Sequence, residues 1–131
     1  MDTQKVLTYW LENAQDAWET AQQLVSGGKN HHALFFGHLS LESYTKAYIV
    51  IKSQDHPLPI HDLRKLLSQI NEPLTQTQVD DLNEITSFCV EARYPEHKLA
   101  LYQKATPEYT RLWLTKIEEY SLWLKAKLNQ K

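Results

Sequence analysis

The chain has 131 residues, a length that allows one domain with its own hydrophobic core. Hydrophobic residues make up 42% of the sequence and include four Trp and seven Tyr, which excludes a disordered chain. The formal net charge is −2, so there is no overall positive field. Any contact with nucleic acid must therefore come from a local patch.

Cys89 is the only cysteine, so no intramolecular disulfide can form, as is usual in a reducing cytoplasm. Its neighbours Phe88 and Val90 favour a small buried side chain over a nucleophile. The first residues lack the charged head and apolar core of a signal peptide, and no apolar run approaches the roughly 20 residues that span a membrane. We expect a cytoplasmic protein with no membrane association.

Two long helices are predicted in the first part of the chain. Over residues 3–26, apolar residues recur at steps of three and four, with Thr3 as the expected N-cap and Gly27 at the C-terminal end. A second helix is expected over residues 30–53. Its segment 33–39 is apolar on nearly all sides, which indicates the most buried helix of a bundle.

The rest of the chain predicts three more helices. A short one covers residues 61–70 and a longer one covers residues 76–91, each with regularly spaced apolar residues. Residues 93–106 have the least regular pattern. The last helix extends to about residue 128, with Thr106 as N-cap and a proline at its first position.

No segment has the alternating, β-branched pattern of a strand, and we find no internal repeat or domain boundary. Four longer helices and one short helix, joined by short links, predict an all-α, up-and-down antiparallel bundle. We expect it to form one domain over residues 1–131.

Three stretches of the sequence occur in the order and spacing of landmarks of a known family. Residues 38–47 read HLSLESYTKA, the short helix opens with His61-Asp62-Leu63, and the fourth helix ends in EARYP at residues 91–95. With an aromatic-rich first helix and a long last helix, the chain resembles the HEPN family over nearly its whole length. These small helical proteins of bacteria and archaea are often found beside nucleotidyltransferases.

The resemblance implies a cytoplasmic bundle that forms a homodimer and works with nucleotides or RNA. Some HEPN proteins are RNA-cleaving toxins, some pair with a minimal nucleotidyltransferase as antitoxin, and others only bind nucleotides. The ribonuclease branch uses an Arg, four to six intervening residues, and a His.

Arg93 and His97 are the candidate catalytic pair, although only three residues separate them and one of these is Pro95. In metal-free RNA cleavage, His97 would act as general base while the guanidinium stabilises the charged phosphorane. Proline disfavours helix at Tyr94, so the two side chains need not share a helical face. Alternatively, Arg93 caps the fourth helix or pairs with a nearby Glu, Tyr94 packs on the core, and His97 is a solvated loop residue.

His38, Glu42 and Lys46 form a ladder at four-residue steps on the second helix. As a nucleotide site, Lys46 would hold a phosphate while His38 and Glu42 contact the base or ribose. Arg93 and Tyr94 complete this predicted binding set. Alternatively, Glu42 and Lys46 are an ion pair at the edge of the bundle.

Other polar residues allow weaker hypotheses. The six His residues do not have the closed spacing of a zinc site, so we predict no metal and no other cofactor, and we expect His61 to cap the short helix. Basic residues on the last helix alternate with Trp113, Tyr120 and Trp123. Such a stripe can stack bases or form a homodimer interface, or it can be core with solvated flanks.

The sequence thus leaves several functions open. The first is a dimeric nucleotide- or RNA-binding accessory module that works with a minimal nucleotidyltransferase, in a toxin–antitoxin-like context. The atypical spacing of Arg93 and His97 favours this non-enzymatic function over a metal-independent ribonuclease toxin. The third is a structural protein-interaction bundle.

Overall fold

The computed structural model describes residues 1–129, except for the side chain of Pro95. This part of the chain forms six helices and no strand, which confirms the all-α fold class. In chain order the helices are α1 (Thr3–Ser26), α2 (Asn30–Ser53), α3 (Leu63–Ser68), α4 (Gln76–Arg93), α5 (Pro95–Lys104) and α6 (Pro107–Leu128).

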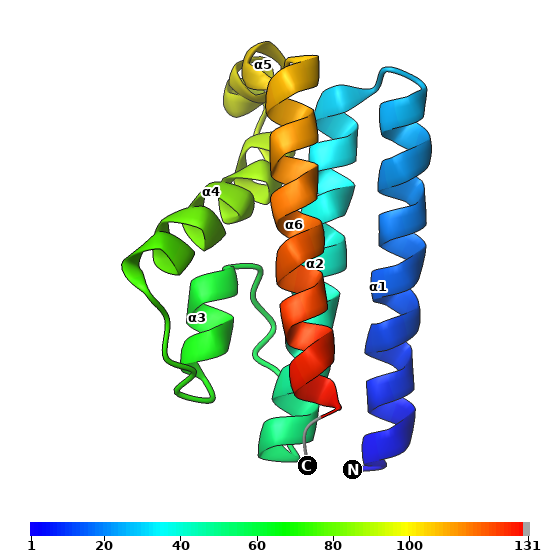
Figure 1. Cartoon of the computed structure of the whole chain (residues 1–131), viewed down its shortest axis with the longest axis vertical. Coiled ribbons are helices and arrows are strands. Elements are labelled where there is room, and N and C mark those ends of the chain that lie inside the picture. Colours follow the sequence, from blue (N-terminus) through cyan, green and yellow to red (C-terminus); the bar gives the residue numbers. More distant parts are fainter. Residues whose placement is uncertain (130–131) are drawn as a thin grey trace.

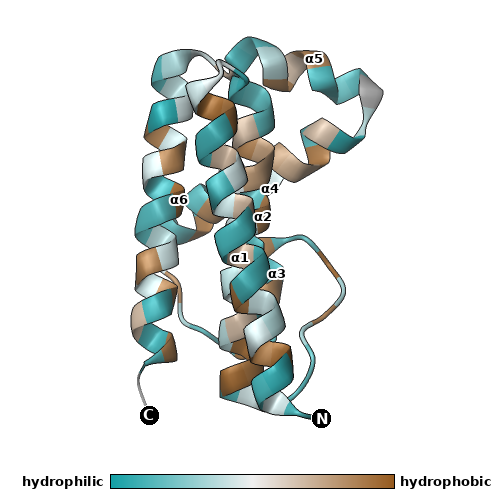
Figure 2. Ribbon diagram, turned by 90° about the vertical axis from the view of Figure 1, so that its right-hand side faces the viewer, coloured by the Kyte–Doolittle hydropathy of each residue, from teal (hydrophilic) through white to brown (hydrophobic). Residues whose placement is uncertain are grey.

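Helix α2 is the centre of the bundle, as the sequence predicted. It packs against α1, α6, α4 and α3, and every residue from Ala33 to Val50 is buried or partly buried. Figure 1 shows α1 and α4 on opposite sides of α2, with α6 in front of it. The face of α1 turned to the viewer in Figure 2 is mostly hydrophilic, so α1 uses only its inner face for packing.

Small residues set the close packing of the long helices. Ala14, Ala17 and Ala21 of α1 are buried at three- and four-residue steps, and the Ser40 hydroxyl of α2 donates to the Ala14 carbonyl over 2.8 Å. On another side of α2, a Cβ atom at Gly37 would lie 2.9 Å from Cδ1 of Ile117. The absence of a side chain at Gly37 therefore lets α6 approach α2 closely.

Helix α5 corrects the expectation of five helices, because residues 93–106 were predicted to be irregular. Tyr94 is extended, with φ −107° and ψ 122°, as expected for a residue before proline. Pro95 then takes the first position of a new helix, where its missing N–H is not needed. Leu101 and Ala105 anchor the C-terminal half of α5 in the core, and Lys104 lies 3.2 Å from Glu91 of α4.

Two predicted caps fall on neighbouring residues. Asp2, rather than Thr3, accepts from the backbone N–H of Lys5 at the start of α1. Asp62, rather than His61, caps α3 by accepting from the N–H of Lys65. A carboxylate at these positions satisfies an unpaired N–H and interacts well with the helix dipole.

Candidate functional site

The ladder predicted on α2 is present, but it lies inside the protein. His38, Glu42 and Lys46 are 0%, 6% and 5% exposed. Lys46 Nζ lies 3.0 Å from Glu42 Oε2, and its ammonium lies 5.0 Å from the ring centre of Trp10 of α1. The ion pair that the sequence placed at the edge of the bundle is therefore buried between α1 and α2.

His61, from the segment before α3, closes the ladder from the other side. Its Nδ1 lies 2.9 Å from Glu42 Oε1, while its carbonyl oxygen accepts from His38 Nε2 over 2.9 Å. The polar groups of the ladder and His61 thus bond mainly to one another. The ladder therefore links α2 to the segment that precedes α3. A nucleotide-binding role for His38, Glu42 and Lys46 stays a prediction, and within this fold they hold helices together.

The surroundings of His38 favour its neutral form. Burial lowers the pKa of His38, against an opposing effect of the Glu42 carboxylate, and the nearby positive charge of Arg93 lowers it further. Donation from Nε2 to the His61 carbonyl fixes the tautomer and leaves Nδ1 as a buried acceptor. Among the described residues, Nδ1 has no hydrogen-bond partner.

The junction between α4 and α5 presents the remaining predicted residues at the surface. Arg93 is exposed at the end of α4, where its Nε donates to Cys89 Sγ over 3.1 Å. It forms no ion pair with any described residue, unlike the part of the alternative interpretation in which it pairs with a nearby Glu. Tyr94 is 52% exposed, so it does not pack on the core as the alternative interpretation expected.

His97 lies in the first turn of α5 and not in a loop. It is exposed, and its ring stands edge-on to Tyr94 with centroids 6.4 Å apart. Because the chain bends at Tyr94, Arg93 and His97 belong to two different helices. The structure therefore brings both residues to one corner without placing them on a common helical face.

A hollow beside this junction contains residues that the sequence did not single out. It has a volume of about 270 Å³ and lies between the first turns of α2 and α5, and Ala92 and Lys98 are among its lining residues. His31, His32, Phe35 and Phe36 of α2 also line it. The usable sequence signal was two aromatic pairs four residues apart, which places all four side chains on one broad helix face.

Family and structural comparisons agree with this architecture. The HEPN domain family model matches residues 7–127. The chain belongs to the HEPN domain family. Its fold is also similar to the crystal structure of TT1696 from Thermus thermophilus, with a TM-score of 0.77 and 18% identity, covering 92% of this chain and 97% of that chain. No curated protein matches the sequence.

Within this HEPN domain, the aromatic stripe of α6 faces inward. Trp113, Tyr120 and Trp123 are partly buried against the core, and the Tyr120 hydroxyl donates to Asp81 of α4 over 2.8 Å. Lys116 Nζ also lies 3.5 Å from Asp81. The aromatic and basic residues of α6 therefore follow the core-with-solvated-flanks interpretation.

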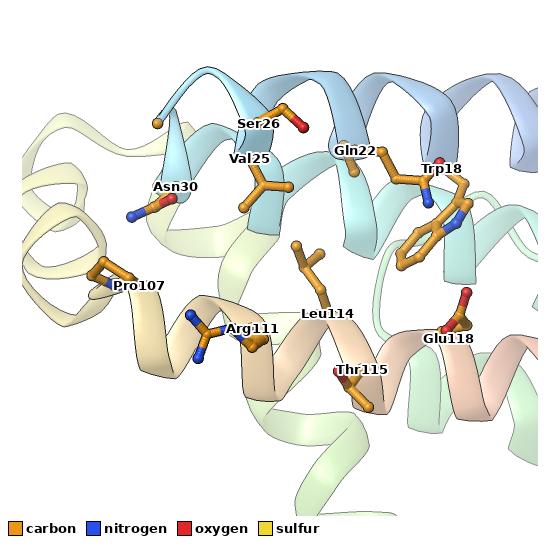
Figure 3. Close-up of a pocket in the computed structure, with 12 residues that line it drawn as sticks. Trp18, Gln22, Val25, Ser26, Asn30, Pro107, Arg111, Leu114, Thr115 and Glu118 are labelled. Atoms are coloured by element: carbon orange, nitrogen blue, oxygen red, sulfur yellow. The ribbon is translucent and has the colours of Figure 1, made fainter.

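A groove runs between α1 and α6 on the HEPN bundle, because these helices both pack on α2 and barely touch each other. Figure 3 shows its first part, a space of about 540 Å³ where Trp18 of α1 stands across from Glu118 of α6, while Arg111 lies nearer to Pro107 and across from Val25. Trp18 and Glu118 also line a second hollow, which in turn shares Tyr44 and Lys125 with a third hollow that reaches Leu128.

Neither a metal centre nor a membrane segment is found in the described part of this HEPN protein. Residues 1–129 contain no group of three His, Cys, Asp or Glu placed to hold a metal ion. None of the helices is both long and apolar enough to cross a membrane.

Proposed function

We propose that this HEPN protein is a nucleotide- or RNA-binding accessory module that acts as a homodimer beside a minimal nucleotidyltransferase. Membership of the HEPN family supports the general class of function. The observation that carries the proposal is the exposed corner at the α4–α5 junction, where Arg93, Tyr94 and His97 are gathered.

Arg93 has the geometry of a phosphate contact. Cys89 holds the guanidinium through Nε, which orients the side chain and leaves its two terminal amino groups for an anion. The exposed ring of Tyr94 offers a surface on which a base can stack. An RNA strand or a nucleotide can therefore bind through its phosphate and its base at one corner.

A ribonuclease is the second candidate, because His97 is exposed at the same corner and contacts Tyr94 edge-on. Metal-free cleavage needs the imidazole and the guanidinium on the same phosphodiester. The bend at Tyr94 places these groups on separate helices, which favours binding without cleavage.

The groove between α1 and α6 supports the partner part of the proposal. Apolar and charged side chains line it over much of the bundle. Leu112 and Leu122, which are close in sequence to the lining residues of α6, are 51% and 57% exposed. Surfaces of this kind pack against another protein chain. Light scattering measures the mass of the complex. The purified protein alone tests the homodimer, and the protein co-expressed with a minimal nucleotidyltransferase tests that partner.

Binding is tested by fluorescence anisotropy with a short labelled RNA and with unlabelled nucleotides as competitors. We expect Arg93→Ala to weaken RNA binding by about tenfold and to reduce the salt dependence by about one phosphate contact. Arg64→Ala is the matched control, because Arg64 is an exposed arginine on α3. Equal binding by the two variants, or no binding by the wild type, would overturn the proposal.

A further inference from the structure

Two hollows meet at the start of α2 and share the side chains of His31 and His32. The first is the 270 Å³ hollow between α2 and α5. The second has a volume of about 500 Å³ and lies between the α1–α2 turn and the α5–α6 turn. The two imidazoles have ring centroids 4.0 Å apart and are tilted by 37° to each other, and the Tyr102 ring stands edge-on to His31 at 5.3 Å.

The first hollow has the walls that a flat, aromatic group needs. Phe35 and Phe36 are only partly buried and stand edge-on to each other with centroids 5.5 Å apart. Leu101 closes the hollow from α5, and Lys98 adds a positive charge. Aromatic faces with a cation nearby bind bases by stacking, with little dependence on base identity.

The second hollow is polar. Lys29, Gln103 and Thr106 line it and offer one cation, an amide and a hydroxyl group. Burial lowers the pKa of His31, and the neighbouring His32 and Lys29 lower it further. A neutral imidazole at His31 can both donate and accept a hydrogen bond at the boundary between the hollows.

The charge of the two hollows selects an anion. No described Asp or Glu lines either of them, although the chain has 16 acidic residues and a net charge of −2. Two lysines and two histidines do line them. The groove between α1 and α6 differs, because Glu118 is part of its wall.

We propose that the paired hollows form a mononucleotide-binding site, with the base against Phe35 and Phe36 and the phosphate beside Lys29. The inference rests on the proposed nucleotide binding and assigns the base and phosphate of a mononucleotide to these hollows, beside the α4–α5 junction where Arg93 and Tyr94 contact a longer RNA strand. His31 and His32 lie between base and phosphate, where the ribose passes from one hollow to the other. The neighbouring Ala92 and Lys98 connect this site with Arg93 and His97 along the chain.

The test follows the imidazole proton signals of the whole protein by NMR during titration with AMP, adenosine and inorganic phosphate. His31→Gln and His32→Gln identify their own signals, and His56, exposed in the segment between α2 and α3, is the internal control. We expect AMP to shift the His31 and His32 signals saturably and to leave the His56 signal unchanged. If inorganic phosphate alone produces the same shifts at the same concentration as AMP, the base does not contribute to binding and the proposal is overturned.

Two variants separate the two hollows and a third is a control, each checked for folding by circular dichroism. Lys29→Ala should weaken AMP binding about tenfold and leave adenosine binding unchanged. Phe36→Leu keeps an apolar side chain but removes the ring, so it should weaken both ligands about tenfold. Lys65→Ala, on the exposed side of α3, should change neither.

Failure of this inference differs from failure of the proposed function. One outcome is that AMP binds the wild type but not Arg93→Ala, and that it leaves the His31 and His32 signals unchanged. The paired hollows are then not the site, and the junction alone binds nucleotide. If neither nucleotide nor RNA binds the folded wild type, the proposed function fails and this inference fails with it.

Discussion

Glu42 Oε1 and His61 Nδ1 lie 2.9 Å apart, although the two residues are 19 positions apart in the chain. The same carboxylate reaches Lys46 through its other oxygen, at 3.0 Å. A single buried acid therefore joins the central helix to the segment that leads into α3, and it neutralises a lysine that is only 5% exposed.

Glu42→Gln should destabilise the protein by about 3–5 kcal/mol, because it leaves the buried Lys46 ammonium without a counter-charge. Urea unfolding followed by circular dichroism measures the change. The double variant Glu42→Gln/Lys46→Met should recover a large part of the loss, since it removes both charges. Glu119→Gln on the exposed side of α6 is the control, and an equal effect of Glu42→Gln and Glu119→Gln would contradict the structural role of Glu42.

Gly37→Leu should separate α2 from α6. A Cβ atom at this position already meets Ile117 at 2.9 Å and Leu114 at 3.0 Å, so a longer side chain has no space. We expect a loss of about 1–3 kcal/mol of unfolding free energy. Gly37→Ala should cost much less, because the two contacted atoms are ends of flexible side chains and alanine favours the helix. A Gly37→Leu protein as stable as the wild type would show that α6 packs differently.

Lowering the pH should destabilise the protein, and part of this loss should depend on His38. Burial lowers the pKa of His38 below 6.5, so the unfolded chain takes up a proton first as the pH decreases. The stabilising contribution of neutral His38 is therefore complete above about pH 6.5 and is lost as the pH decreases below that value. Glu42, His61 and Arg93 face the same imidazole, so the comparison needs a matched variant.

His38→Gln provides that variant, because glutamine keeps a donor near the His61 carbonyl but does not titrate. Between about pH 7.5 and about pH 5.5, the wild type should lose more unfolding free energy than His38→Gln. Parallel pH profiles of the two proteins would show that His38 is not the titrating group.

Cys89 should be unreactive in the folded protein. It is 2% exposed, and burial raises the pKa of its thiol despite the neighbouring Arg93 guanidinium. Iodoacetamide should therefore modify Cys89 at the rate of global or local opening, with full reactivity in urea. Mass spectrometry measures the labelled fraction, and rapid labelling without denaturant would mean that the α4 surface near Arg93 is open.

Local patterns predicted the long helices well. The bounds of α1 and α2 agree with the expected 3–26 and 30–53, and Thr106 caps α6 as expected. Helix α5 was missed because its proline suggested a break and because Leu99 and Tyr102 are 62% and 64% exposed. Its apolar residues therefore do not follow one buried stripe, and its position depends on contacts of Leu101 and Ala105 with the rest of the bundle.

The candidate site could be predicted only in part. The four-residue spacing placed Glu42 and Lys46 next to each other, and they do form an ion pair. Their burial depends on Trp10 and His61, which come from other segments of the chain and which no local pattern connects to α2. The hollows around His31 and His32 likewise exist only because α5 folds back over the start of α2.

The most direct test of the proposed function is incubation of a labelled RNA with the purified protein in EDTA, with binding and cleavage measured in the same samples. We expect the wild type to bind the RNA and leave it intact, and Arg93→Ala to bind it about tenfold more weakly. Cleavage by the wild type that both Arg93→Ala and His97→Ala lose would contradict an accessory role. It would identify a metal-independent ribonuclease at the α4–α5 junction instead.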